Sequence, residues 1–340
     1  MEKASQQNKS RLELRNSVNN FFHQPILLKE VEELLNIKRG EWYLDATVGG
    51  GGHAKTIIAK GGRVLGLDWD QDAIEFASKA LAFLSPNGEV CPTPPFPETF
   101  SRNGGAKSQN KPNKDWLLIR ENFSKIRQVA AYFNLEGEFA GVLFDLGTSF
   151  YQLTTPERGF SFKSQALDMR MSQEEKVNAA DLLKVLSEKE LAQIFEKFSQ
   201  EKMARPLAKA IVQARQKKPL ESGEELAALI ENVYRQKGEK RGKIHPATKV
   251  FQALRIAVND EINNLKRALP QALGVLKRGG RLLVISFHEG EDREVKNFFR
   301  NWEKEGKAKI LTPKPVSPKE EEKRLNQASR SAKLRAILKV

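Results

Sequence analysis

The chain of 340 residues has a single cysteine, Cys91. One thiol excludes an internal disulfide framework and a cysteine-rich zinc site, and it is typical of a reducing cytoplasm. Histidine is also scarce, because the four histidines are scattered without HxH or HExxH spacing. We therefore expect a cytoplasmic protein without a metal centre.

Long apolar runs are missing as well. No stretch of 18 apolar residues occurs, and residues 1–22 contain no apolar segment like that of a secretory signal. The sequence thus predicts neither a membrane-spanning helix nor export.

Acidic residues are in the minority. Lys and Arg number 57 against 43 Asp and Glu, which gives a net charge of +14 and a pI of about 9.7. Residues 304–340 hold eleven basic and four acidic residues, and residues 200–243 hold eleven and six. This balance favours a polyanionic partner, most often nucleic acid, although solvated helix faces explain it equally well.

One stretch near the start of the chain has the layout of a nucleoside-binding site. An apolar run at 42–44 precedes DATVGGGGH at 45–53, and a second apolar run at 63–67 ends in Asp68. The pattern predicts a strand, a glycine loop, a helix and a second strand that ends in a carboxylate. Glycines let the backbone approach a ligand closely, and the carboxylate can accept hydrogen bonds from ribose hydroxyls.

The glycine motif alone does not identify the cofactor. Gly49, Gly51 and Ala54 also satisfy G-x-G-x-x-[GA], so an NAD-dependent dehydrogenase is one alternative. Asp45 favours S-adenosylmethionine instead. A carboxylate at this place suits a cofactor with ammonium and sulfonium cations, and it lies badly beside a pyrophosphate.

Apolar runs alternate with helical patterns over most of the chain. This alternation predicts a doubly wound α/β fold with a parallel sheet. The expected strands are 42–44, 63–67, 116–119, 139–144 and 281–287, the expected helices are 25–35, 70–84, 124–133, 248–275 and 292–302, and a turn is expected at 277–280.

Two segments interrupt the alternation. Residues 85–115 are rich in proline and contain a Gly-Gly pair, which predicts a largely disordered insertion. Residues 174–243 have helical periods without strands. We expect a first part of the core at 1–165 with frayed residues at its start, a helical insertion domain at 166–245, and a second part of the core with a basic carboxyl-terminal tail at 246–340.

Polar and aromatic residues follow the ends of the expected strands. They are Asp45, Asp68, Phe123, Asp145 and His288. Ligands of doubly wound sheets bind outside the carboxyl ends of the strands, so we expect these residues to converge on one crevice. His53, directly after the glycine loop, is placed to contact the cofactor.

Two further stretches predict substrate contacts. The DLGTSFYQ segment at 145–152 can orient a substrate amine or hydroxyl, or Asp145 or Ser149 can instead cap a helix. Beyond it, arginines near phenylalanines suit a stacked base and a bound phosphate, although such a loop can also pack on its own rings. The candidates are Arg158, Phe160, Phe162 and Arg170. His288 can act in proton transfer or as a structural hydrogen-bonding group.

Taken in order, these motifs resemble the RsmH (MraW) family of bacterial 16S ribosomal RNA methyltransferases. They are HQPILLKEV from His23, YLDATVGGGGHA from Tyr43, GLDWDQDAI from Gly66, GVLFDLG from Gly141, ERGFSF from Glu157, LDMRM from Leu167, VFQALRIAVNDE from Val250, LKRGGRLLVISFHEGEDR from Leu276 and RSAKLR from Arg330. No glycine motif is specific for this family by itself. The motifs LDMRM, FQALRIAVNDE and SAKLR in this order are specific for it when they occur together.

The resemblance implies S-adenosylmethionine-dependent N4-methylation of one cytidine in the decoding region of 16S rRNA of the small ribosomal subunit. It implies a class I, Rossmann-like methyltransferase fold with an inserted helical domain that faces RNA rather than DNA. The oligomeric state, a dimer included, is left open. By motif position, the cofactor would contact Gly50, Gly51, Gly52, His53, Asp68, Phe123, Asp145 and Gln152.

The chain departs from the family pattern on the expected substrate side. Thr148, Phe150 and Tyr151 replace Val, Ser and Pro of DLGVSSPQL, and Glu289-Gly290 replace Ser-Leu of HSLEDR. The cytosine amine is a poor nucleophile, so we hypothesise that Asp145 or Ser149 orients it. The cytidine must also swing out of its stack.

Two alternatives besides the dehydrogenase are kept. One is a non-catalytic RNA-binding or assembly factor, which would bind RNA without a cofactor. The other is a methyltransferase for a small molecule or a protein, whose substrate binding would depend little on salt.

Overall fold

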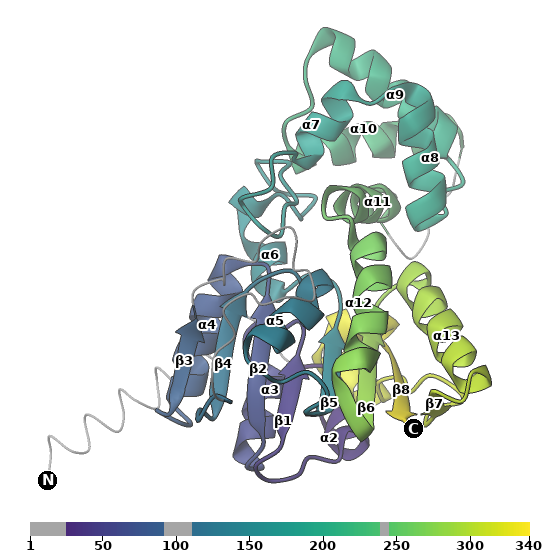
Figure 1. Ribbon diagram of the computed structural model, residues 1–340. Helices are drawn as coiled ribbons and strands as arrows, with labels where there is room; N and C mark the ends of the chain where they lie inside the picture. Colours follow the sequence, from purple (N-terminus) through teal and green to yellow (C-terminus); the bar gives the residue numbers. More distant parts are fainter. Residues whose placement is uncertain (1–24, 92–110, 239–244) are drawn as a thin grey trace, which may run out of the picture. The chain divides into compact units, whose positions relative to one another are not determined.

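The computed structural model describes residues 25–91, 111–238 and 245–340 (Figure 1). The chain forms two compact units. The first combines the described residues before 150 with Asn263–Val340, and the second is Phe150–Ile262. This second unit is longer than the 166–245 segment expected from the sequence.

A mixed sheet is the framework of the first unit. Its described strands follow the order β3-β4-β2-β1-β5-β6-β8-β7, in which only β8 runs against the others. The strands are β1 (Trp42–Asp45), β2 (Arg63–Asp68), β3 (Gly88–Cys91), β4 (Trp116–Arg120), β5 (Phe139–Asp145), β6 (Leu276–Ser286), β7 (Ala308–Ile310) and β8 (Lys333–Lys339).

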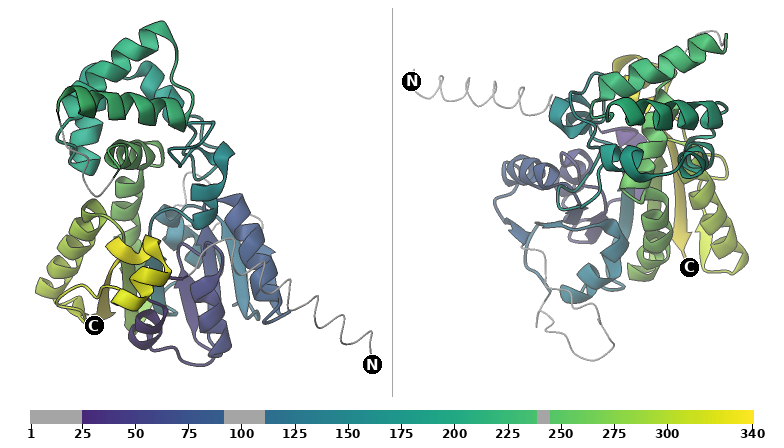
Figure 2. Two further views of the ribbon diagram at one scale, coloured as in Figure 1. Left: turned by 180° about the vertical axis from the view of Figure 1, so that it is seen from behind. Right: turned by 90° about the horizontal axis from the view of Figure 1, so that it is seen from above.

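Helices cover both faces of this sheet, because each presents an apolar stripe to it. On one face, α2 (Leu28–Leu35), α3 (Gly52–Ala59) and α4 (Gln71–Ala82) pack on the strands. On the other lie α5 (Ile126–Tyr132), α12 (Glu261–Val275) and α13 (Glu289–Lys304). The left view of Figure 2, in which the molecule is seen from behind, shows the face covered by α2, α3 and α4. The doubly wound α/β prediction is confirmed.

The strand order reverses at β1, which lies between β2 and β5. In doubly wound sheets this switch point opens a crevice at the carboxyl ends of the strands. The glycine loop follows β1 directly, so the fold places it at that crevice.

Several elements of the first unit differ from the sequence prediction. Part of the expected insertion at 85–115 forms β3, an edge strand. The predicted basic tail is wrong, because β8 is a largely buried strand between β6 and β7. The segment before it contains α14 (Glu320–Leu325) and η3 (Gln327–Ser331). The expected frayed start and residues 92–110 lie outside the described residues.

The expected turn at 277–280 is part of β6 instead. The pairing of β5 with β6 shifts between Phe139 and Gly141, which accommodates the extra residues as a bulge. Gly279 has a φ of 77°, a conformation that glycine adopts at little cost.

The single helix expected at 248–275 is two helices, α11 (Thr248–Val258) and α12. The break lies at Asn259 and Asp260, where Asp260 has a φ of 47°. The Asn259 amide donates to the carbonyl of Met169 at 2.7 Å and accepts from the N–H of Met171 at 2.8 Å. These bonds to a distant loop stabilise the break.

The second unit is helical and has its own apolar core. Its elements are α6 (Phe150–Thr154), η2 (Pro156–Arg158), α7 (Ala179–Val185), α8 (Glu188–Ser199), α9 (Ala204–Lys217), α10 (Gly223–Gln236) and α11. Asn178 and Ser187 begin α7 and α8 with capping boxes, in which side chain and backbone N–H groups satisfy each other. Within the described residues, no helix of either unit is long and apolar enough to cross a membrane.

Candidate active site

The loop after β1 is bound to the end of β2. The N–H of Gly49 donates to Asp68 Oδ2 at 2.9 Å, and the N–H of Asp70 donates to Asp68 Oδ1 at 2.9 Å. Asp68 therefore accepts a backbone hydrogen bond on each carboxylate oxygen. Because the glycine loop and the helix after β2 share this residue, the carboxylate is held at the sheet edge.

The ends of β1 and β5 are joined in the same way. The N–H of Asp145 donates to the Thr47 hydroxyl at 2.6 Å, and the N–H of Thr47 donates to Asp45 Oδ1 at 3.3 Å. His53, the second residue of α3, places its Nε2 3.5 Å from Asp145 Oδ2. The structure thus brings together Asp45, Thr47, His53 and Asp145, as the strand-end argument predicted for the two carboxylates.

The carboxylates at this edge are difficult to ionise in the protein alone. Burial raises the pKa of Asp45 to about 6, with a further rise from Asp145, while His53 and the N–H of Thr47 oppose it. Burial likewise raises the pKa of Asp68 to about 7, although the N–H groups of Asp70 and Gly49 oppose the rise. A bound cation would reverse these shifts, because it favours the charged carboxylates.

Glycines make room at the site. Gly51 has a φ of 77°, in the left-handed region that other residues adopt at a cost. At Gly66 in β2, a Cβ would lie 2.5 Å from Leu118 Cδ2 and 3.1 Å from Val48 Cγ2. Gly66 therefore allows Val48 of the glycine loop to pack directly on the sheet.

The remaining predicted cofactor residues of this unit are Gly50, Gly52 and Phe123. Gly50 is buried, and Gly52 begins α3. Phe123 follows β4 and packs edge-on against Phe144, with ring centroids 5.7 Å apart. Phe123 is only partly buried.

The arrangement suits a ligand that is cationic and carries hydroxyl groups. Asp45 and Asp145 supply negative charge beside the glycine loop, and Asp68 offers carboxylate oxygens at the end of β2. His53 is 5% exposed, and neither of its ring nitrogens has a hydrogen-bond partner among the described residues. A buried polar atom of this kind normally has a partner, which a ligand can provide.

Five predicted site residues belong to the second unit. Gln152 is buried in α6. Arg158 is 6% exposed and donates from Nη2 to the carbonyls of Arg170 and Met171 at 3.1 and 2.9 Å. Arg170 binds Asp168 through Nε and Nη2, at 2.8 and 2.6 Å.

The two phenylalanines also have partners inside the second unit. Phe160 is buried in its core. Phe162 stacks on His245, with centroids 4.5 Å apart, and meets Phe251 edge-on at 4.8 Å. These contacts stabilise the unit itself, and RNA contact by Arg158, Phe160, Phe162 and Arg170 stays a prediction.

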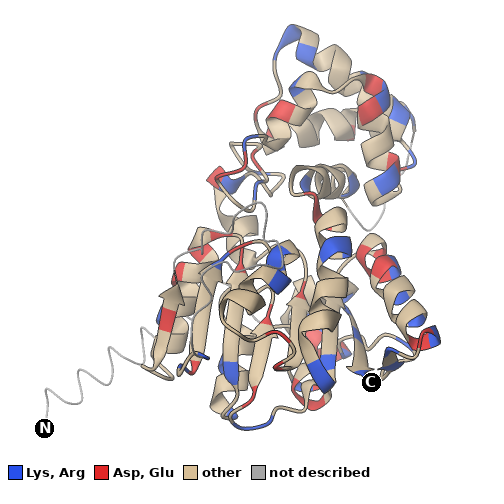
Figure 3. Cartoon of the chain, viewed as in Figure 1, with Lys and Arg blue, Asp and Glu red and all other residues tan. Residues whose placement is uncertain are grey.

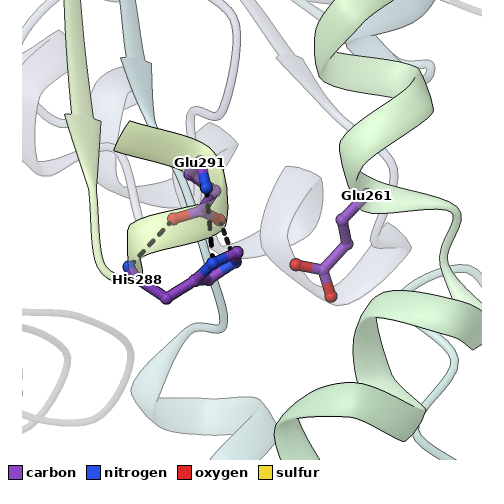
Figure 4. A group of neighbouring side chains, drawn as sticks. All are labelled: Glu261, His288 and Glu291. Carbon is purple, nitrogen blue, oxygen red and sulfur yellow. Dashed lines mark hydrogen bonds and ion pairs between the residues drawn. The ribbon is translucent and has the colours of Figure 1, made fainter. Parts of the chain in front are cut away.

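His288 begins α13 as its N-cap. Its Nδ1 accepts from the N–H of Glu291 at 3.4 Å, and Glu291 Oε2 accepts from the N–H of His288 at 3.4 Å (Figure 4). This is a capping box, the structural alternative considered for His288. Glu261, also drawn in Figure 4, belongs to the second unit and binds Arg255 there at 2.8 Å. Ser149 is partly buried just before α6.

Sequence reasoning missed Thr47 and the contact between His53 and Asp145. Thr47 lies inside the DATVGGGGH motif, where a hydroxyl two residues after a carboxylate was an available signal. His53 and Asp145 are 92 positions apart, and only the pairing of β1 with β5 brings them together.

Comparison with known proteins gives the family. A family model described as the MraW methylase family matches residues 20–90 and 104–340, which leaves residues 91–103 of the proline-rich segment unmatched. A ribosomal RNA small subunit methyltransferase H from Carboxydothermus hydrogenoformans is 42% identical over 94% of this chain and 98% of its own length. Its counterpart from Coprothermobacter proteolyticus is 41% identical over 93% and 96%.

Among solved structures, a rRNA methylase from Streptococcus thermophilus matches with a TM-score of 0.41 and 11% identity, over 93% of this chain and 98% of that chain. The family match and the sequence relatives cover nearly the whole chain, and they argue against the dehydrogenase alternative. The chain belongs to the MraW methylase family.

Proposed function

We propose that the protein transfers a methyl group from S-adenosylmethionine to N4 of one cytidine in the decoding region of 16S rRNA. The observation that carries the proposal is the carboxyl edge at the switch point. There the glycine loop, Asp45, Asp68 and the His53–Asp145 contact lie together. The family match and the names of the relatives support RNA of the small ribosomal subunit as the substrate. A ribosomal substrate would place the reaction in the cytoplasm.

The residues at the edge fit the proposed methyl donor. Asp68 would bind the ribose hydroxyls, because its oxygens are held at the end of β2 by the N–H groups of Gly49 and Asp70. Phe123 would pack against the adenine. Asp45 would lie near the cationic part of the donor. The positive charge of the donor would favour the ionised form of the Asp45 carboxylate. When bound, the donor supplies an electrophilic methyl group on a sulfonium.

Asp145 is the proposed catalytic residue. The lone pair of the cytosine N4 is delocalised into the ring, so the amine needs an acceptor that orients it toward the methyl group. Asp145 ends β5 beside the glycine loop, and its backbone N–H is fixed by Thr47. Its carboxylate would accept a hydrogen bond from the amine and take the proton that N4 loses as the methyl group leaves the sulfonium, with S-adenosylhomocysteine as the second product. His53 at 3.5 Å would hold the carboxylate in place. Ser149 is the second candidate acceptor.

The experiment that tests the function uses small ribosomal subunits from a strain that lacks this protein. The protein is incubated with them and with S-adenosylmethionine labelled in its methyl group, and the RNA nucleosides are then analysed. Label in N4-methylcytidine of 16S rRNA would support the proposal. Transfer to another nucleoside, or no transfer despite binding of S-adenosylhomocysteine, would overturn the proposed substrate.

Replacement of the proposed acceptor gives a sharper test. Asp145→Ala should lower turnover by about 10²–10⁴-fold, the usual contribution of a positioned acid–base group. The affinity for S-adenosylhomocysteine should change much less. Glu138→Ala removes a partly exposed carboxylate just before the other end of β5 and serves as the control. Full activity of Asp145→Ala would show that the assignment is wrong.

A further inference from the structure

About two thirds of the chain lies outside the helical unit, and this part carries a similar share of the net positive charge. Residues 150–262 hold 20 Lys and Arg against 16 Asp and Glu, whereas the rest of the chain holds 37 against 27. On the helices of the second unit, basic and acidic residues are interspersed (Figure 3). An RNA substrate would therefore meet positive charge on the remainder of the chain as well as on the helical unit.

Part of this charge lies at the carboxyl edge of the sheet, on the β6–β8 side. Lys333, the first residue of β8, pairs with Ser286, the last residue of β6. Arg330 lies in η3, three residues before Lys333, and Arg293 lies in the first turns of α13, directly after β6. Arg293 and Arg330 are exposed, and the described residues offer neither of them an ion pair.

Asp292, which directly precedes Arg293, is already neutralised. Asp292 accepts from the buried Arg335 on both oxygens, with Nε–Oδ1 at 2.6 Å and Nη2–Oδ2 at 3.1 Å. Burial alone would raise the pKa of Asp292, but the hydrogen bonds and charge of Arg335 outweigh it and hold the pKa below its usual range. Lys333 also forms an ion pair with this carboxylate, with Nζ 3.7 Å from Oδ2, and its side chain is 37% exposed.

We propose that Arg293, Arg330 and Lys333 form a binding surface for the phosphates of the RNA strand that flanks the target nucleotide. The proposal rests on the proposed function and adds where the RNA backbone binds. The three cations stand at the edge of the sheet where β1, β2 and β5 place the candidate active site. Asp292 and Arg335 position the surface, because their bidentate pair joins the start of α13 to β8.

The test measures RNA binding by the full chain, separately from methyl transfer. The double variant Arg293→Gln/Arg330→Gln is compared with the wild type by fluorescence anisotropy on a labelled single-stranded fragment of 16S rRNA. Each lost phosphate contact lowers the salt slope by about 0.7 for single strands. If the variant loses two contacts, the ratio of its Kd to the wild-type Kd should be about sevenfold smaller at 200 mM salt than at 50 mM salt.

Two further variants separate charge from structure. Arg278→Gln removes an exposed arginine at the opposite end of β6 and should leave affinity and salt slope unchanged. Arg293→Lys/Arg330→Lys keeps the charges and should recover most of the affinity, because a phosphate contact depends mainly on charge.

The outcomes distinguish this inference from the proposed function. If the double variant binds RNA like the wild type, or if Arg278→Gln weakens binding equally, the surface is wrong even where the wild type methylates rRNA. If the variant loses affinity and salt slope as expected, the surface is supported. Failure of the wild type to methylate small subunits would instead overturn the substrate proposed above.

Discussion

Asp45 should cost the protein stability at neutral pH. Its folded-state pKa of about 6 lies above the ordinary value of 3.8, because the side chain is only 1% exposed. The folded state thus binds this proton more tightly than the unfolded state does. The contribution of the protonated Asp45 side chain to the free energy of unfolding is fully present below about pH 4. It is lost as the pH rises through about 6.

The magnitude follows from the two pKa values. A difference of about two pKa units corresponds to about 3 kcal/mol when both states are fully ionised. The isosteric Asp45→Asn removes the titration and can keep the acceptor for the N–H of Thr47. Relative to the wild type, Asp45→Asn should therefore gain about 2 kcal/mol in the free energy of unfolding between pH 4.5 and pH 8.

Urea unfolding followed by tryptophan fluorescence measures this change. All four tryptophans, Trp42, Trp69, Trp116 and Trp302, lie in the first unit, so the signal reports the unit that contains Asp45. Asp292→Asn is the control of opposite sign. Its pKa is lowered in the folded state, so the variant should lose most stability at pH 8 and progressively less toward low pH.

A difference between Asp45→Asn and wild type that does not change with pH would refute the reasoning about burial. Ligand affinity provides a second test of the same carboxylate. Asp45→Asn should lose more affinity for S-adenosylmethionine than for S-adenosylhomocysteine, because only the first carries a sulfonium charge. Equal losses for the two ligands would show that Asp45 does not respond to the cation.

Two other predictions concern β2. Asp68→Asn should weaken S-adenosylhomocysteine binding by about 10–100-fold in calorimetry, since hydrogen bonds to a charged group contribute about 1.5–3 kcal/mol; unchanged affinity would remove Asp68 from the cofactor site. Gly66→Ala should destabilise the first unit by about 1–3 kcal/mol in urea unfolding, because its Cβ would lie 2.5 Å from Leu118. A variant as stable as the wild type would show that Val48 and Leu118 shift at no cost.

The strands that build the crevice were predictable because they are buried on both faces. β1, β2, β4 and β5 are continuous apolar runs, and each was predicted to within one residue at either end. Their carboxyl ends must share one edge, so the approach of Asp45, Asp68 and Asp145 followed from the sequence. The approach of His53 to Asp145 did not, because it depends on the direction of a single helix.

The other elements carry weaker local signals. β3 and β7 are short edge strands with exposed residues, and β8 alternates lysine and arginine with apolar residues in a segment whose charge suggested a tail. The break between α11 and α12 depends on Asn259, whose partners are about 90 positions away. Local patterns do not contain such distant contacts.

The place of β8 in the sheet has a consequence for the order of folding. β6 and β7 gain their shared neighbour only after residue 339 has been synthesised, whereas the helical unit between residues 150 and 262 is complete much earlier. Domains tend to fold as their chain emerges, so the helical unit can form first while the strands that flank it in sequence wait. Ribosomes that stall before Lys333 would therefore release chains with an open sheet edge, exposed to aggregation and proteolysis. Arg330 and Lys333 would reach their places only in a chain whose sheet has closed.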